Sequence, residues 1–138
     1  MKFYHVNHNV ADLDRSSNFY KEHFGMTRID GYELGDMQLV FLGFEPGNAV
    51  LELTWLENRN LNGDVLDFYK GQTDLSSVDS VKKPFHMAFF SNDFETDLAK
   101  HKAAGIVVEE ELEVGIYFVK DPDGYLIEIA NGANYDQP

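Results

Sequence analysis

Two segments, one near each end of the chain, combine a short strand-like pattern with a helical pattern that stops at a glycine. In the first segment, apolar and polar residues alternate over residues 3–10, and a helical spacing runs from Leu13 to Phe24, just before Gly25. A glycine directly after the last periodic residue is a typical helix stop. The pattern predicts a strand at 3–10 and a helix at 13–24, one face of which would carry Leu13, Ser17, Tyr20 and Phe24.

The second half repeats this order. A strand-like stretch at residues 85–90, apolar except for His86, precedes a helical stretch at 94–104, which ends before Gly105. Asn92 followed by Glu95 has the spacing of a capping pair at a helix start. The pattern therefore predicts a second strand–helix unit of the same kind.

The spacing of the two halves also agrees. His5 precedes Asp12, at the expected helix start, by seven positions, and His86 precedes Asp93 by seven as well. From the histidine to the closing glycine is 20 residues in one half and 19 in the other. We interpret this agreement as an internal repeat. Further strands are expected at 37–42 and 49–55 in the first half, and at 106–108, 116–119 and 125–130 in the second.

Each half thus has the order strand, helix, and further strands, which gives an α+β fold of two paired βαβββ modules. The first module covers residues 1–55 and the second covers residues 84–132. A polar connector at 56–83 joins them, with a helical turn expected at Val65–Lys70. Residues 133–138 are expected to form a flexible tail.

Composition and charge exclude several classes of protein. The 138 residues are 43% hydrophobic and 25% charged, as in an ordinary globular protein, and none is cysteine. A disulfide scaffold, a thiol nucleophile and a cysteine-ligated zinc are therefore excluded. The formal charge of −13 disfavours nucleic acid and anionic membranes as partners, since both need positive patches. No apolar run approaches the roughly 20 residues that span a bilayer, and no signal-peptide stretch follows Met1, so we expect a cytoplasmic protein.

Strand periodicity places four polar residues opposite apolar neighbours. Successive side chains of a strand point to opposite faces, so Glu52 opposes Leu51 and Leu53, and Glu128 opposes the apolar residues on either side of it. His5 and His86 stand between apolar residues in the same way. Each half therefore offers one histidine and one glutamate.

Such a set suits a single divalent metal ion. A lone glutamate among apolar residues would be costly or would become protonated, so two of them call for a partner. Two imidazoles and two carboxylates offset a 2+ charge and fit octahedral nickel, zinc, cobalt, manganese or iron with open water positions. The sequence predicts a metal site made of His5, Glu52, His86 and Glu128.

The remaining candidates have simpler explanations. His8 lies on the opposite strand face from His5, which indicates a structural or surface residue. His23 would sit favourably at a helix C-terminus, and His101, four residues after Asp97, would be an exposed pairing residue. The acidic run at 109–111 is expected to be a solvated loop.

At these residues the chain resembles glyoxalase I and its relatives in the vicinal-oxygen-chelate superfamily. Three segments carry the resemblance. The first is the opening of the chain, with His5, residues 10–16, Phe19, Tyr20 and residues 24–26. The other two are the strand at 51–54 and the turn and strand at 121–128. The resemblance covers nearly the whole chain apart from the connector and the tail. The 121–124 turn and the strand after it are shared widely across the superfamily, and glutamate at position 52 favours glyoxalase I over epimerase or dioxygenase relatives.

The resemblance implies two βαβββ modules that form a cup-shaped mixed sheet around the metal. It also implies a lactoylglutathione lyase-like reaction, in which the hemithioacetal of methylglyoxal and a thiol becomes a 2-hydroxyacyl thioester. His5, Glu52, His86 and Glu128 would be the ligands, with Glu128 as the base and Glu52 as a possible second participant. A homodimer is expected, and the site could form within one chain or across two.

The sequence departs from the family pattern where glutathione is usually held. Asn9 stands where arginine is common, Leu56 stands where asparagine is common, and the loop that usually carries lysine is acidic at 109–113. An anionic tripeptide would meet repulsion there. Basic residues that could compensate are Arg28, Arg59, Lys82 and Lys83. The sequence therefore leaves the thiol open.

Two alternatives also stay open. An extradiol-type dioxygenase would hold iron with His5, His86 and Glu128 and would not need Glu52. A non-catalytic module of the resistance type would sequester a small molecule in the cup and would hold no metal tightly.

Overall fold

The computed structural model describes residues 1–44, 48–57 and 85–134 of the chain. The chain divides into two compact units, Met1–Gly71 and Gln72–Pro138. The helical turn expected at Val65–Lys70 and most of the expected connector lie outside the described residues. No helix in the described ranges is long and apolar enough to cross a bilayer.

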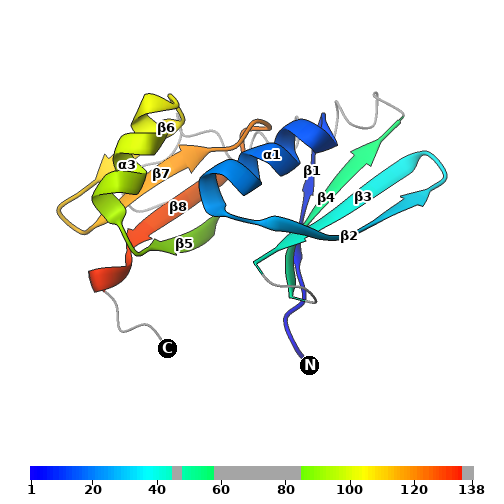
Figure 1. Ribbon diagram of the computed structural model, residues 1–138, viewed down its shortest axis with the longest axis horizontal. Helices are drawn as coiled ribbons and strands as arrows, with labels where there is room; N and C mark the ends of the chain where they lie inside the picture. Colours follow the sequence, from blue (N-terminus) through cyan, green and yellow to red (C-terminus); the bar gives the residue numbers. More distant parts are fainter. Residues whose placement is uncertain (45–47, 58–84, 135–138) are drawn as a thin grey trace. The chain divides into compact units, whose positions relative to one another are not determined.

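The first unit has the order strand, helix, strand, strand, strand (Figure 1). Its sheet has the strand order β1-β4-β3-β2, in which β1 and β4 are parallel and the other two pairs are antiparallel. The first and last strands of the unit are therefore neighbours. The elements are β1 (Val6–Asn9), α1 (Leu13–Phe24), β2 (Thr27–Leu34), β3 (Met37–Gly43) and β4 (Ala49–Leu56).

The second unit repeats the same plan. Its strand order is β5-β8-β7-β6, again with the first and last strands parallel and the remaining pairs antiparallel. The predicted α+β fold of two βαβββ modules is confirmed. The elements are β5 (Met87–Ser91), α3 (Phe94–Ala103), β6 (Val107–Glu111), β7 (Ile116–Lys120), β8 (Leu126–Asn131) and the short 3₁₀ helix η2 (Gly132–Asn134). The expected tail at 133–138 thus begins inside η2, and residues 135–138 lie outside the described ranges.

Local signals fix both ends of α1. The side chain of Asp12 accepts a hydrogen bond from the Arg15 backbone N–H at 2.9 Å, which caps the first turn. At the other end, Gly25 has a φ of 70° and its N–H donates to the Lys21 carbonyl. This left-handed conformation suits glycine because it has no Cβ. The helix therefore has the predicted bounds. Its buried residues are Ser16, Phe19 and Tyr20, of which only Tyr20 lies on the predicted face.

The start of α3 differs from the prediction. Its N-cap is Asp93, whose side chain makes no capping hydrogen bond, so the predicted Asn92–Glu95 capping pair is wrong. Ser91 provides the contact instead. Its hydroxyl accepts from the Asp93 backbone N–H at 3.1 Å and donates to Asp97 at 2.6 Å.

Two separate hydrophobic cores lie between a helix and one face of a sheet. In the first unit, Leu51 and Leu53 of β4 are fully buried, with Tyr20 of α1. In the second, Ile127 of β8 and Tyr117 of β7 are fully buried in the same way. Because alternate residues of β4 and β8 are used for these cores, the residues between them face the other side of each sheet.

One strand, β2, was not predicted from the sequence pattern. β2 carries Asp30, Gly31 and Glu33, and most of its residues are exposed, so no period-2 alternation marks it. It forms by antiparallel pairing with β3, which no local signal reports. The acidic run at 109–111 was also wrongly expected to be a loop, since it lies in β6 at the edge of the second sheet.

Candidate metal centre

The first predicted pair of ligands is brought together in the first unit. His5 directly precedes β1, and Glu52 lies in the middle of β4, the neighbouring parallel strand. The distance from His5 Nε2 to Glu52 Oε2 is 3.4 Å, and the two side chains are 26% and 17% exposed. Both groups are thus partly shielded from water but accessible to an ion.

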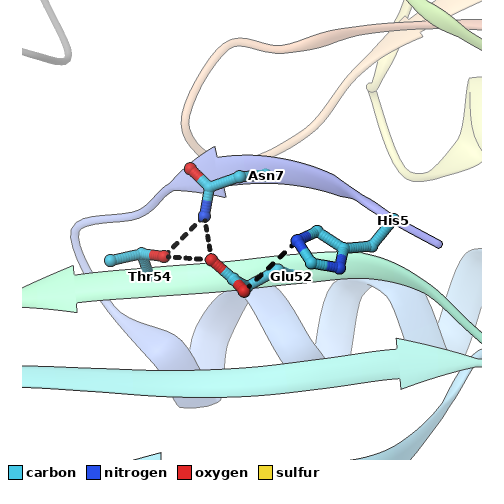
Figure 2. Close-up of polar contacts among 4 residues, drawn as sticks. All are labelled: His5, Asn7, Glu52 and Thr54. Carbon is cyan, nitrogen blue, oxygen red and sulfur yellow. Dashed lines mark hydrogen bonds and ion pairs between the residues drawn. The ribbon is translucent and has the colours of Figure 1, made fainter. Parts of the chain in front are cut away.

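Glu52 is held from its other side by two neutral residues. Figure 2 shows Asn7 and Thr54 beside Glu52, on the side away from His5. The Asn7 amide donates to Glu52 Oε1 at 2.8 Å and to the Thr54 hydroxyl at 2.5 Å. The Thr54 hydroxyl in turn donates to Glu52 Oε1 at 3.2 Å. One carboxylate oxygen is therefore occupied by donors, and the other faces the histidine.

The second predicted pair recurs at the equivalent place in the second unit. His86 directly precedes β5, Glu128 lies in β8, and Nε2 and Oε2 are 3.1 Å apart. The side chains are 20% and 21% exposed, close to the values of the first pair. The repeat inferred from the sequence thus extends to the placement of the predicted ligands.

A phenylalanine side chain packs against the histidine of each pair. Phe41 of β3 is opposite Glu52 in the ladder and meets the His5 ring edge-on, with centroids 5.3 Å apart. Phe118 of β7 is likewise opposite Glu128 and meets the His86 ring at 5.5 Å. Each imidazole therefore packs against an aromatic wall, which restricts its rotation.

The first pair also has exposed aromatic neighbours. Tyr4 contacts the His5 ring at 4.6 Å and stacks on Phe41, and Tyr32 meets Phe41 at 6.0 Å. Tyr4 is 58% exposed and Tyr32 is 50% exposed. The histidine of this pair is thus surrounded mainly by aromatic rings, whereas the glutamate has polar neighbours in Asn7 and Thr54.

The donor set fits a divalent metal ion. Imidazole nitrogen and carboxylate oxygen are the common ligands of such ions, and two neighbouring octahedral ligands at about 2.1 Å from a metal lie roughly 3 Å apart. The two pairs, at 3.4 and 3.1 Å, are close to that spacing. Within the described ranges, no lysine or arginine forms an ion pair with Glu52 or Glu128.

Each unit brings together two of the four predicted ligands. In the parts of the chain that the structure describes, no group of three or more His, Asp or Glu side chains is placed to hold a metal. The structure therefore brings His5 to Glu52 and His86 to Glu128, and a four-ligand site requires both pairs.

Two other histidines are structural. His8 is 4% exposed, its Nδ1 lies 3.2 Å from the Tyr20 hydroxyl, and burial lowers its pKa from 6.5 to about 3. This confirms its assignment as a residue outside the site. His101 was wrongly predicted to be exposed: it is 2% exposed and lies 2.9 Å from the Tyr117 hydroxyl.

A separate hollow in the first unit does not include the ligands. It has a volume of about 530 Å³, and its lining includes Asp12, Arg28, Glu33 and Trp55. Trp55 shares the α1 face of β4 with Leu53, whereas Glu52 points to the other face. The hollow thus contains none of the predicted ligands, although Tyr32, which contacts Phe41, is also part of its lining.

Sequence reasoning missed Asn7 and Thr54, although a signal was present. Each lies two residues after a predicted ligand, Asn7 after His5 and Thr54 after Glu52. Period 2 places such residues on the face of the ligand. Phe41 and Phe118 have no comparable signal, since their positions depend on strand register.

The fold and the pairs together define a class of protein: duplicated βαβββ modules, each with a histidine beside its first strand and a glutamate on its last. Comparison with known families agrees. The family model described as Glyoxalase/Bleomycin resistance protein/Dioxygenase superfamily matches residues 2–129. The chain belongs to this superfamily.

Several individual relatives are named lactoylglutathione lyase or glyoxalase I. A probable lactoylglutathione lyase from Vibrio cholerae is 35% identical over 135 residues, which cover 91% of this chain and 86% of that protein. A lactoylglutathione lyase from Schizosaccharomyces pombe is 32% identical over 154 residues, and the match covers 95% of this chain but only 48% of the yeast protein. Among solved structures, the trypanothione-dependent glyoxalase I of Leishmania major has a TM-score of 0.73 at 28% identity, covering 96% of this chain and 88% of that one.

Proposed function

We propose that this chain is a metal-dependent glyoxalase I-like lyase. It would convert the hemithioacetal of methylglyoxal and a thiol into a 2-hydroxyacyl thioester. The observation that carries this proposal is the duplicated pair, His5 with Glu52 and His86 with Glu128, each at the same ladder position of its module. The names of the relatives from Vibrio cholerae and Schizosaccharomyces pombe support the same reaction.

The four side chains would hold one divalent ion, such as nickel, zinc, cobalt, manganese or iron. When bound, such an ion polarises the oxygens of the substrate. Glu128 removes the proton from the carbon that carries sulfur and returns it to the neighbouring carbon, as a carboxylate within reach of both can. Phe41 and Phe118 hold the histidines in orientation and keep the surroundings apolar, which limits exchange of that proton with water.

The thiol is proposed to be one that carries less negative charge than glutathione at its binding end. Asn9 and Leu56 replace the arginine and asparagine expected for a glutathione site, and the run Glu109–Glu111 lies along β6. Lys102 pairs with Glu110 at 3.0 Å, so this lysine is already engaged by an acidic side chain. The Leishmania major relative, described as trypanothione-dependent, is an example of a related enzyme with another thiol.

The dioxygenase alternative receives no support from the geometry. It needs only His5, His86 and Glu128, whereas Glu52 lies next to His5 and is held there by two hydrogen bonds. The binding-module alternative likewise gives no reason for the matched pairs. We also retain a cytoplasmic homodimer as part of the proposal, to be tested by sedimentation of the purified protein.

One experiment tests the proposed function. The metal content of the purified protein is measured first, and isomerisation of methylglyoxal is then measured with a panel of thiols that includes glutathione. We expect about one divalent ion per site and turnover with at least one thiol. Glu52→Gln should weaken metal binding, and Glu128→Gln should abolish turnover. If both variants keep the wild-type metal content and rate, the four-ligand proposal is wrong.

A further inference from the structure

The two glutamates differ in what surrounds them, although their modules are alike. Asn7 lies opposite Glu52 in the β1–β4 ladder, and Thr54 follows Glu52 by two residues on the same face. At the equivalent positions around Glu128, the second unit has Ala88 and Ala130. The polar pair in one module is thus replaced by two methyl groups in the other.

The contacts around Glu52 form a closed triangle with consistent donors. An ionised carboxylate only accepts hydrogen bonds, so the Asn7 group at 2.8 Å from Oε1 is its NH₂ and not its carbonyl. The second hydrogen of that NH₂ points to the Thr54 hydroxyl, and the hydroxyl hydrogen points to Oε1 (Figure 2). Rotation of the Glu52 carboxylate would break two hydrogen bonds at once.

The hydroxyl of Thr54 belongs to a buried residue. Thr54 is 6% exposed, so water does not readily replace its hydrogen bonds. Glu128, in contrast, has His86 as its hydrogen-bond partner, and no second side-chain donor contacts it within the described ranges.

We propose that Asn7 and Thr54 are positioning residues that lock Glu52 in one orientation as a permanent metal ligand. Glu128, beside which the described part of the chain places no such pair of donors, is then the carboxylate that moves and carries the proton. This inference rests on the proposed function, and it removes Glu52 as a second base. The two modules therefore have unequal roles despite their matched ligands.

Metal affinity tests the lock without reference to activity. The variants are Asn7→Leu and Thr54→Val, which keep the size of each side chain but remove the donor, and Thr54→Ser is the matched control that keeps the hydroxyl. Metal dissociation constants are measured by competition with a chromophoric chelator. Loss of a residue that orients a metal ligand typically weakens binding 10- to 100-fold. We expect a rise of roughly 10-fold or more for Thr54→Val and Asn7→Leu, and near wild-type affinity for Thr54→Ser.

Thermal unfolding of the metal-free variants separates a lock from a purely structural contact. Similar unfolding temperatures of the Thr54→Val and Thr54→Ser proteins, together with different metal affinities, would support the proposal. Equal metal affinities in all variants, while the wild type binds metal and turns over substrate, would overturn the lock and leave the proposed function intact. A wild type without metal binding and without turnover would instead overturn the proposed function and the lock with it.

Transfer of the lock to the other module gives an independent test. Ala88→Asn, alone and together with Ala130→Thr, would place the same donors beside Glu128, with Ala88→Leu as a control of similar size without a donor. We expect kcat to fall about tenfold or more with Ala88→Asn, less with Ala88→Leu, and the metal affinity to be kept in both. An Ala88→Asn enzyme as fast as the Ala88→Leu enzyme would show that Glu128 needs no freedom to move.

Discussion

His86 Nε2 lies 3.1 Å from Glu128 Oε2, although 42 residues separate them in the chain. The parallel pairing of β5 with β8 makes this contact, because it places the first and last strands of a module side by side. The β1–β4 pairing places His5 and Glu52 together in the same way. Residues from the two ends of each module are thereby joined at one site, and a ligand that binds there ties those ends together.

Metal binding should therefore stabilise the fold. An ion that binds only the folded protein adds about 2.7 kcal/mol to the free energy of unfolding when present at roughly 100 times its dissociation constant. We expect the unfolding temperature to rise with metal concentration in the wild type, and His86→Ala to lose much of this rise. Calorimetry with and without a chelator measures both. An unfolding temperature that does not depend on metal would contradict a site at these residues.

Stability should fall in acid because of His8. Its folded pKa of about 3 lies below its ordinary value of 6.5, so the unfolded chain binds more protons between these values. The stabilising contribution is complete above pH 6.5 and is lost as the pH falls towards 3, at about 1.4 kcal/mol per pH unit. Urea unfolding of the metal-free protein at several pH values measures the slope.

His8→Asn provides the comparison for that slope. It keeps a polar group near Tyr20 but cannot titrate in this range, so the variant should lose less stability per pH unit than the wild type. Parallel pH profiles of the two proteins would show that His8 is not buried in its neutral form.

The two helix N-termini should respond differently to the same substitution. Asp12 caps α1 with a 2.9 Å hydrogen bond, and Asp12→Ala should lower the free energy of unfolding by about 1 kcal/mol. Asp93 makes no such bond, and Asp93→Ala should change it by about 0.5 kcal/mol or less. Denaturant unfolding followed by circular dichroism compares the two. Equal losses would contradict the difference in capping.

The core of the first unit should be sensitive at β4 and tolerant at β2. Leu53 is fully buried, so Leu53→Ala should lower the free energy of unfolding by about 2–5 kcal/mol. Leu34 is 55% exposed, and Leu34→Ala should change it by about 0.5 kcal/mol or less. Urea unfolding measures both values, and a large loss at Leu34 would mean that this side chain is covered in solution.

Features with local causes could be predicted from the sequence. The bounds of α1 follow from two nearby residues. The Asp12 side chain caps the first turn, and the left-handed backbone of Gly25 ends the helix. The ligand strands follow from alternation around Glu52 and Glu128. The repeat supplied the equivalence of the two halves, and with it the pairing of one histidine with one glutamate in each.

Features that depend on distant partners could not be predicted in this way. His101 is buried next to Tyr117, 16 residues later, and its Nδ1 lies within hydrogen-bond distance of the Tyr117 hydroxyl. Nothing in the surrounding helix sequence indicates this contact. β2 is a strand because β3 pairs with it, despite its polar composition. The difference between Glu52 and Glu128 likewise depends on which residues of a neighbouring strand stand opposite each one.

The glutamates of β6 have a consequence for solubility. Among the described strands, β6 is the outermost of its sheet, and residues 109–111 are all glutamate. An unpaired strand edge can join the edge of another molecule and start aggregation, and charged side chains along it oppose that joining. Two such strands brought edge to edge would set six carboxylates against each other. We therefore expect these glutamates to oppose pairing of this strand edge with the strand edges of other molecules.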